Sequence, residues 1–176
     1  MRIIAGTYGG RQLVAPKTRG TRPMTDKTRE ALFSALGSLE GLSVLDAYAG
    51  SGALGFEALS RGAQQVVAVE MGQAAVQSIR TNLKALDVSW SYTLEEKRVE
   101  SWLAQSPQQR FDLIFAMPPY AVLDRELLSR LGALLNRDGV MVVEYPRQVK
   151  DYQLEGLTVI EARSYGDPTL GFYKPA

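Results

Sequence analysis

A segment in the first third of the chain has the residue types of a cofactor site. It runs from Val44 to Ala63 and consists of a short apolar strand that ends in Asp46, two closely spaced glycines and a helix. Glycines let backbone amides approach a ligand closely, and the first N–H groups of a helix are unpaired. A second acid, Glu70, ends the next apolar run, at about the twenty-residue interval at which a doubly wound sheet places an acid on a ribose. The pattern predicts a site for a nucleotide-like cofactor.

The turn after Asp46 reads Tyr48-Ala49-Gly50-Ser51-Gly52, and because we expect its glycine spacing to differ from the G-x-G-x-x-G of pyrophosphate sites, we do not expect a pyrophosphate ligand there. The pattern D-x-[FY]-x-G-S-G resembles the first cofactor motif of methyltransferases that use S-adenosylmethionine, in particular those that methylate exocyclic amino groups of nucleic-acid bases. Any α/β protein also needs a glycine turn after some strand. The second acid, Glu70, favours the cofactor interpretation over that alternative.

The composition is that of one globular domain. A chain of 176 residues with 45% apolar and 22% charged residues is long enough to bury a full core. No apolar run approaches the roughly 18 residues of a membrane span, and the opening MRIIAGTYGG lacks the apolar core of a signal peptide. We expect a single cytoplasmic domain without a membrane partner, made of a basic extension, residues 1–22, and a core, residues 23–176.

The chain contains neither cysteine nor histidine. This composition removes disulfides, thiolate nucleophiles, the usual zinc sites and an imidazole base, and we expect no metal. Methylation of a pyrimidine carbon ordinarily uses a cysteine adduct. A methyltransferase of this composition must therefore attack with an atom that already has a lone pair, and nitrogen is the expected acceptor.

Basic residues gather at the start of the chain. Residues 1–30 carry seven of them against Asp26 and Glu30, a balance of +5, whereas the whole chain has a net charge of +1. Such clustering on a near-neutral chain is typical of a surface that binds the phosphate backbone of a nucleic acid. A merely solvated segment would have the same charge pattern. The side chains expected to contact RNA are Arg2, Arg11, Lys17, Arg19 and Arg22.

The periodicity of apolar residues predicts alternating strands and helices. A hairpin over residues 1–15 is expected to pack outside the core, and Asp26, as N-cap or first-turn acid, begins a helix that Gly37 ends. After it we expect strands 43–48, 65–70, 90–94, 112–117 and 140–145, helices 54–61, 73–86, 99–104 and 125–135, the last closed by 136–139, and a final strand pair, 157–165 and 170–174. This alternation predicts a Rossmann-like α/β fold with a seven-stranded, mostly parallel sheet, a C-terminal antiparallel hairpin and helices on both faces.

A second stretch with chemical character, FDLIFAMPPY, spans residues 111–120. A buried strand ends there in two prolines, which lack an N–H and fix φ, so the turn is rigid and orients its carbonyls. The strand order then places this turn and the glycine turn at one edge of the sheet. Tyr120 could stack on a flipped base, an interaction that contributes about 1–3 kcal/mol. By itself the stretch favours a structural Pro-Pro turn with a core tyrosine, and the first motif is what favours the functional interpretation.

Together these motifs resemble bacterial methyltransferases that methylate the exocyclic N2 of a guanine in 16S, small-subunit ribosomal RNA. The resemblance covers essentially the whole chain and is carried by MRIIAGTYGGRQL, TRPMTDKTREALFSALG, VLDAYAGSGALGFEALSRGA, VVAVE, FDLIF followed by PPY, and SYGDPTLGFY. It implies direct in-line transfer of a methyl group from S-adenosylmethionine to the amino nitrogen, accelerated mainly by positioning. It also implies that the partner is small-subunit RNA or its assembly particle, and we expect a monomer.

The same resemblance assigns site residues by motif position. Thr25 and Arg29 would lie near the methionine end of the cofactor, Asp46 would face its amino group and Glu70 would hold the ribose hydroxyls. The cofactor-binding set is Thr25, Arg29, Asp46, Tyr48, Gly50, Ser51, Gly52, Leu54, Glu70 and Met71. The catalytic set is Met117, Pro118, Pro119 and Tyr120, in which the Pro118 carbonyl and Tyr120 position the base.

Two positions depart from the family pattern. The family has Asp or Asn before the two prolines, and that side chain accepts a hydrogen bond from the target amino group. This chain has Met117, whose thioether is a weak acceptor. The change could cost on the order of 3 kcal/mol, roughly a hundredfold in rate. Arg98 stands where the family usually has an acid or amide that contacts the adenine amino group, and Glu100 could take that role.

Three functions are compatible with the sequence. The first is methylation of guanine N2 in small-subunit ribosomal RNA. The second is a catalytically impaired or inactive relative that still binds the RNA or its assembly particles, because Met117 supplies no strong acceptor. A methyltransferase for DNA adenine or for a small amine ranks last, since it does not explain the matches at both ends of the chain.

Overall fold

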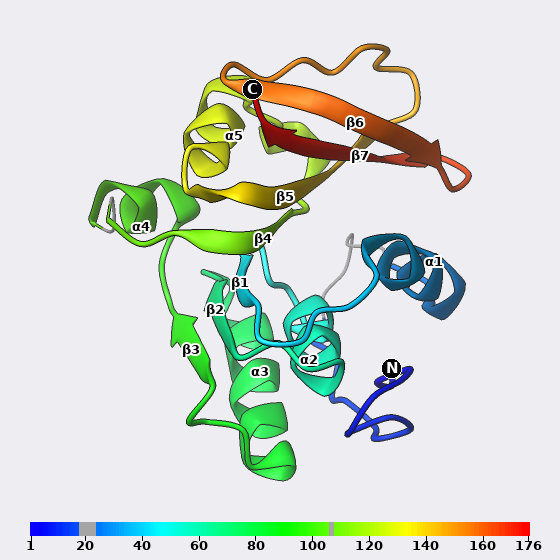
Figure 1. Ribbon diagram of the computed structural model, residues 1–176. Coiled ribbons are helices and arrows are strands. Elements are labelled where there is room, and N and C mark those ends of the chain that lie inside the picture. Colours follow the sequence, from blue (N-terminus) through cyan, green and yellow to red (C-terminus); the bar gives the residue numbers. More distant parts are fainter. Residues whose placement is uncertain (18–23, 106–107) are drawn as a thin grey trace.

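A computed structural model describes residues 1–17, 24–105 and 108–176 (Figure 1). Its strands are β1 Ser43–Asp46, β2 Gln65–Val69, β3 Tyr92–Glu95, β4 Phe111–Ala116, β5 Leu135–Pro146, β6 Leu157–Ser164 and β7 Pro168–Pro175. Its helices are α1 Asp26–Leu36, α2 Ala53–Ser60, α3 Gln73–Leu86, α4 Val99–Gln105 and α5 Arg125–Gly132, with a single 3₁₀ turn, η1, at Tyr120–Val122. None of these helices is long and apolar enough to cross a membrane.

The strands form one sheet in the order β3-β2-β1-β4-β5-β7-β6. Strands β1 to β5 pair in parallel, and β7 lies antiparallel between β5 and β6. The predicted mostly parallel sheet with an antiparallel closing pair is confirmed. Its order reverses at β1 and β4, so that the carboxyl ends of these two strands form the crevice in which doubly wound folds bind their ligands.

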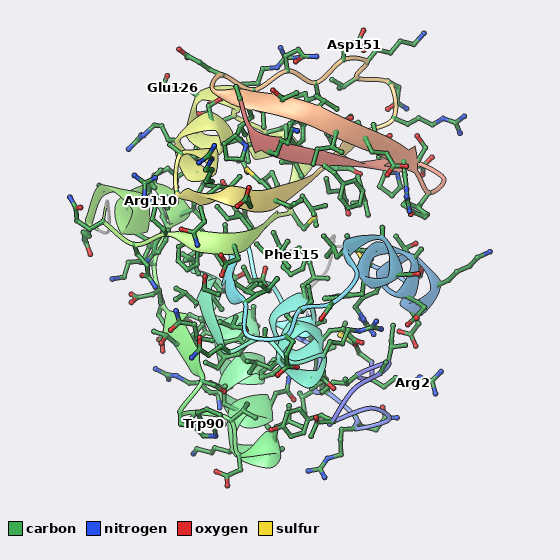
Figure 2. The ribbon with its side chains drawn as sticks, viewed as in Figure 1. Arg2, Trp90, Arg110, Phe115, Glu126 and Asp151 are labelled. Carbon is green, nitrogen blue, oxygen red and sulfur yellow. The ribbon has the colours of Figure 1, made fainter. Side chains whose placement is uncertain are left out.

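Helices cover both faces of the sheet, as predicted (Figure 1). Helices α1, α2 and α3 bury one apolar cluster on their face, and α4 and α5 bury a second cluster on the other. Figure 2 shows Phe115 of β4 in the interior, on the side of α1 and α2, where its ring lies 5.6 Å from that of Phe33. The site residues at the strand ends are therefore supported from both sides by a packed core.

The capping residues explain the ends of the helices. The Thr25 side chain accepts a hydrogen bond from the Thr28 amide at 3.1 Å, so Thr25 is the N-cap of α1 and Asp26 is a first-turn acid. Gly37, at φ +75°, ends α1, and Asp87, at φ +56°, ends α3. These local signals are why the predicted bounds of both helices agree with the structure.

The opening segment, residues 1–17, differs from its prediction. It forms a hairpin with a single antiparallel bridge, between Arg2 and Gln12, but it does not pack outside the core. Ile3 and Leu13 are 1% and 5% exposed and belong to the apolar cluster under α1, α2 and α3. The expectation was wrong because these two apolar side chains bury more surface on the helices than an isolated hairpin could.

Strand β5 also begins earlier than predicted. Helix α5 ends at Gly132, and Leu135, expected to be helical, pairs with Phe111 at the start of β5. The sequence is misleading here because the apolar spacing of a helix continues into Leu135, which is buried in either state. The turn-forming residues 136–139 produce a break in register within the strand and do not precede it.

Candidate functional site

The glycine turn after β1 leaves open space above its backbone. Gly50 and Gly52 have φ values of +54° and +76°, in the left-handed region that favours glycine. A Cβ on Gly50 would meet no atom within 4 Å, whereas one on Gly52 would lie 2.8 Å from the Phe56 ring. Gly52 thus packs the turn onto the core, and Gly50 presents bare backbone to a ligand.

Glu70, after β2, is fixed against this turn. One carboxylate oxygen accepts the Gly50 amide at 2.8 Å, and the other accepts the amides of Met71 and Gly72 at 2.9 and 2.7 Å. The Met71 side chain beside it is 57% exposed. The result is an oriented, partly exposed carboxylate next to the apolar Met71 side chain.

Asp46, at the end of β1, is a buried acid. It is 1% exposed, and one carboxylate oxygen accepts the Gly55 amide at 3.2 Å. Burial raises the pKa of Asp46 to about 7, and the Glu70 charge adds to the rise, although the Gly55 N–H opposes it. A carboxyl with this pKa changes its charge in the physiological range and suits a cationic partner only when ionised.

Tyr92 lies directly below the glycine turn and was missed by the sequence prediction. Its hydroxyl would be 2.9 Å from a Cβ on Gly52, and it is buried without a hydrogen-bond partner in the described part of the chain. Burial first, and then the charge of Asp46, raises the Tyr92 pKa. No sequence signal marks Tyr92, because it belongs to a short edge strand far from the motif.

The glycine spacing is less discriminating than expected. Gly50, Gly52 and Gly55 stand in the order G-x-G-x-x-G, so the spacing alone gives no ground for excluding a pyrophosphate. Gly55 allows α2 to pack closely on the sheet, because a Cβ there would lie 2.9 Å from the Tyr92 ring and 3.0 Å from Val66. The choice of cofactor therefore depends on the other residues and on the relatives.

The remaining predicted cofactor residues lie at different depths around the turn. The Ser51 hydroxyl donates to the Met1 sulfur at 3.4 Å, and Leu54 is buried in the first cluster. Tyr48 packs against the second cluster, where burial, and after it the charge of Glu100, raises its pKa. Glu100 is thus near the end of β1, whereas the Arg98 side chain is exposed.

The side chain of Arg29, a residue of α1, lies between that helix, α2 and the opening segment. It is 1% exposed, and its guanidinium donates to the Arg2 carbonyl at 2.5 Å and to Asp26 at 3.0 Å. Its Nε is 3.8 Å from a carboxylate oxygen of Glu57, a fully buried acid of α2. Glu57 also accepts the amides of residues 4 and 5 at 2.7 and 3.1 Å and the Arg61 Nε at 2.8 Å. This buried network holds the opening segment beside the site.

The turn after β4 places the predicted catalytic residues next to β5. Met117 packs against the first cluster, Pro118 is buried and Pro119 is exposed. Tyr120 is 44% exposed, and its hydroxyl donates to the Glu144 carboxylate at 3.2 Å. Burial first, and then Glu144, raises the pKa of Tyr120 to about 12.

Glu144 was not among the predicted site residues, although a signal for it exists. It follows the apolar run Val140–Val143 of β5, just as Asp46 and Glu70 follow those of β1 and β2. Burial raises the pKa of Glu144, and the hydrogen bond from Tyr120 partly offsets that rise. A rule that every acid directly after an apolar run is a candidate would have found it.

The predicted RNA-binding residues differ in their surroundings. Arg2 is exposed and lies 3.4 Å from Asp26, and Figure 2 shows it on the opening segment. Arg11 donates to the Ala85 carbonyl at the end of α3, at 3.0 Å, and Lys17 is exposed. Arg19, Arg22 and the proposed boundary between residues 22 and 23 lie outside the described residues. Over the described ranges, no three His, Cys, Asp or Glu side chains are grouped to hold a metal.

Comparisons with known proteins match the chain along its length. A family model described as "Conserved hypothetical protein 95" matches residues 1–174. The "Putative rRNA methyltransferase YlbH" of Bacillus subtilis is 35% identical over 99% of this chain and 98% of its own. The "Ribosomal RNA small subunit methyltransferase D" of Escherichia coli K12 is 36% identical over 92% of this chain and 80% of its own.

A solved structure agrees with the fold. The "Putative methyltransferase yhhF" of Escherichia coli superposes with a TM-score of 0.86 and 29% identity, over 99% of this chain and 97% of that one. The sheet order described above thus belongs to a Rossmann-like methyltransferase fold. With the family model covering nearly every residue, the chain belongs to the family described as conserved hypothetical protein 95.

Proposed function

We propose that this chain transfers a methyl group from S-adenosylmethionine to the exocyclic N2 of a guanine in 16S, small-subunit ribosomal RNA. Relatives aligned over nearly the whole chain are named as ribosomal RNA methyltransferases. The observation that carries the proposal is the convergence of three turns at neighbouring strand ends. Asp46 ends β1 and the glycine turn follows it, Glu70 follows β2, and the Pro-Pro turn with Tyr120 follows β4.

The residues of the site fit S-adenosylmethionine. The Glu70 carboxylate can accept the ribose hydroxyls, and the exposed Met71 side chain offers an apolar surface to the adenine. Asp46 supplies a negative charge for the ammonium group, and the space above Gly50 accommodates the ligand. When bound, the cofactor supplies a methyl group activated by a sulfonium.

The chain's own residues then position the base. The exposed face of Tyr120 can stack on a guanine flipped out of its helix, and the Pro118 carbonyl, held by a rigid turn, can accept one of its N–H groups. Met117 adds no strong acceptor, which favours the second candidate function, a catalytically impaired relative that binds the same RNA.

The deciding experiment is transfer of a labelled methyl group to small-subunit RNA and to its assembly particles, with the native chain and with Met117→Asp. We expect the native chain to label one nucleotide, and mapping to identify guanine N2. Label from the variant alone would support the impaired relative. Label from neither chain, while both bind the cofactor, would contradict the enzymatic proposal for these substrates.

Asp46 makes cofactor binding depend on pH. If only the ionised carboxylate binds the ammonium group, a pKa of about 7 predicts about tenfold tighter binding at pH 8 than at pH 6. Because the folded-state pKa lies above the unfolded value, this group also lowers stability as the pH rises toward 7.

The test is calorimetric titration with S-adenosylmethionine across that range. Asp46→Asn is the control, since it keeps the shape of the side chain but does not titrate. The cofactor's own amino group titrates equally with both proteins, so the difference between them reports Asp46. An equal pH dependence in the native chain and the variant would contradict the role given to Asp46.

The basic opening segment predicts the salt dependence of RNA binding. Removal of one cation that neutralises a phosphate should flatten the slope of log K against log salt by about 0.7 for single-stranded RNA. We expect this change for Arg11→Gln and for Arg19→Gln. Arg163→Gln is the matched control, because Arg163 lies on the edge strand β6 and pairs with Glu161. If neither Arg11→Gln nor Arg19→Gln changes the slope, these residues do not neutralise phosphates and the RNA binds to another surface.

A further inference from the structure

The site has a carboxylate beside the position where the acceptor is missing. Strands β4 and β5 are parallel, and Ala116 pairs with Val143, so the next residues along the two chains are Met117, just past the end of β4, and Glu144, two residues before the end of β5. Adjacent strands are about 4.8 Å apart. An acid at position 144 is therefore within one side chain's reach of the place where an acid or amide at position 117 would act.

Both side chains are on the same face of the sheet. Phe115 and Val142 belong to the cluster under α1, α2 and α3, and alternate residues of a strand share a face. Met117 and Glu144 are each two residues further on, and Met117 does pack against that cluster. The Glu144 carboxylate thus lies on the side of the sheet where α1 begins.

Tyr120 links this carboxylate to the predicted base-stacking surface. Its hydroxyl donates to one oxygen of Glu144, Oε1, at 3.2 Å. No hydrogen bond to the other oxygen, Oε2, is present among the described residues. A base that stacked on the half-exposed Tyr120 ring would therefore lie beside an oriented carboxylate with unused acceptor capacity.

We propose that Glu144 is the hydrogen-bond acceptor for the target guanine, in the role that Met117 cannot fill. The proposal rests on the proposed function. The edge of guanine that carries N2 presents the N1–H and two N2–H donors, and one carboxylate accepts two such donors side by side. Adenine and cytosine do not present this pair, so the interaction would select guanine as well as orient its amino nitrogen.

The methyl transfer balances in atoms and electrons. The N2 lone pair forms the new N–C bond, the C–S bond breaks, and its electron pair remains on sulfur. The methylated nitrogen carries one proton too many, and the Glu144 carboxylate accepts that proton and later releases it to water. Partial burial among apolar neighbours strengthens this hydrogen bond relative to one in water.

The test compares single-turnover methyl transfer by the native chain, Glu144→Gln, Met117→Asn and the double variant. In Glu144→Gln the amide oxygen can keep the bond from Tyr120, which turns the NH₂ toward the guanine donors. We expect about a hundredfold slower transfer with an unchanged dissociation constant for S-adenosylmethionine. We expect Met117→Asn to restore the rate of Glu144→Gln to within tenfold of native, because it supplies an acceptor from the neighbouring strand.

A binding measurement gives a second readout that needs no turnover. Two RNAs differ only in guanosine or inosine at the mapped nucleotide, and inosine lacks the N2 amino group. We expect the native chain to prefer guanosine by about tenfold and Glu144→Gln to bind both equally. Glu161→Gln, an exposed acid of β6, is the control and should behave as native.

The outcomes separate the two proposals. A Glu144→Gln variant that transfers methyl at more than a third of the native rate would overturn the role of Glu144 and leave the proposed function intact. Transfer that requires Asn at position 117, whatever stands at 144, would overturn the role of Glu144 and would support the impaired relative in place of the proposed enzyme. Transfer by none of the four chains would contradict the proposed function and this inference together.

Discussion

Glu57→Gln lowers the free energy of unfolding by about 3–5 kcal/mol, which is the expected cost of removing one partner from a buried charge pair. Glu57 is fully buried and accepts hydrogen bonds from two amides of the opening segment and from Arg61. A glutamine presents its NH₂ to these donors and leaves the buried Arg29 without the charge that lies 3.8 Å away. The opening segment should therefore detach from α2.

Urea unfolding followed by circular dichroism measures this destabilisation. Glu30→Gln is the matched control, since Glu30 pairs with the same Arg61 at 2.8 Å but is half exposed. An exposed pair contributes about 1 kcal/mol or less. Equal destabilisation by the two variants would mean that the buried network does not anchor the opening segment.

Glu70→Gln weakens binding of S-adenosylmethionine by about a hundredfold. The three backbone amides on the Glu70 carboxylate use both oxygens, so the NH₂ of a glutamine must face at least one N–H. The glycine turn then loses its bond to Glu70, or the ribose hydroxyls lose a charged acceptor. Hydrogen bonds to charged groups contribute about 1.5–3 kcal/mol each, and the upper part of that range corresponds to a hundredfold.

Calorimetric titration measures the effect, with the unfolding curve as a check that the variant is folded. Glu95→Gln is the control. Glu95 ends the neighbouring strand β3 opposite Val69, and its carboxylate forms an ion pair with Lys97 at 2.8 Å. A change of less than threefold for Glu70→Gln would mean that the ribose lies elsewhere.

The predictable parts of the fold carry their signals locally. Gly37 and Asp87 end α1 and α3 at the expected places because both residues adopt the left-handed conformation that stops a helix. The acids Asp46 and Glu70 were found because each follows an apolar run, and parallel pairing of β1 and β2 brings them to one edge. The proposed site therefore depends mainly on sequence order and on the rules for doubly wound sheets.

The unpredicted parts involve interactions between distant segments. The bond from Tyr120 to Glu144 joins residues 24 apart, and it requires the register of β4 on β5. The docking of the opening segment requires Glu57, a single acid within an apolar helix, which the sequence alone marks only as a polar interruption. Periodicity shows which face of an element is buried, but not which partner covers it.

The position of β7 between β5 and β6 has a consequence for synthesis on the ribosome. Until residues 168–175 have emerged, β5 has a neighbour only at β4, and the backbone groups of Met141 to Pro146 along its other edge are unpaired. This edge belongs to an apolar strand, and open apolar edges promote pairing between chains. A nascent chain of this protein is therefore most prone to aggregate just before its final strand is released, and that interval is when a chaperone would protect it most.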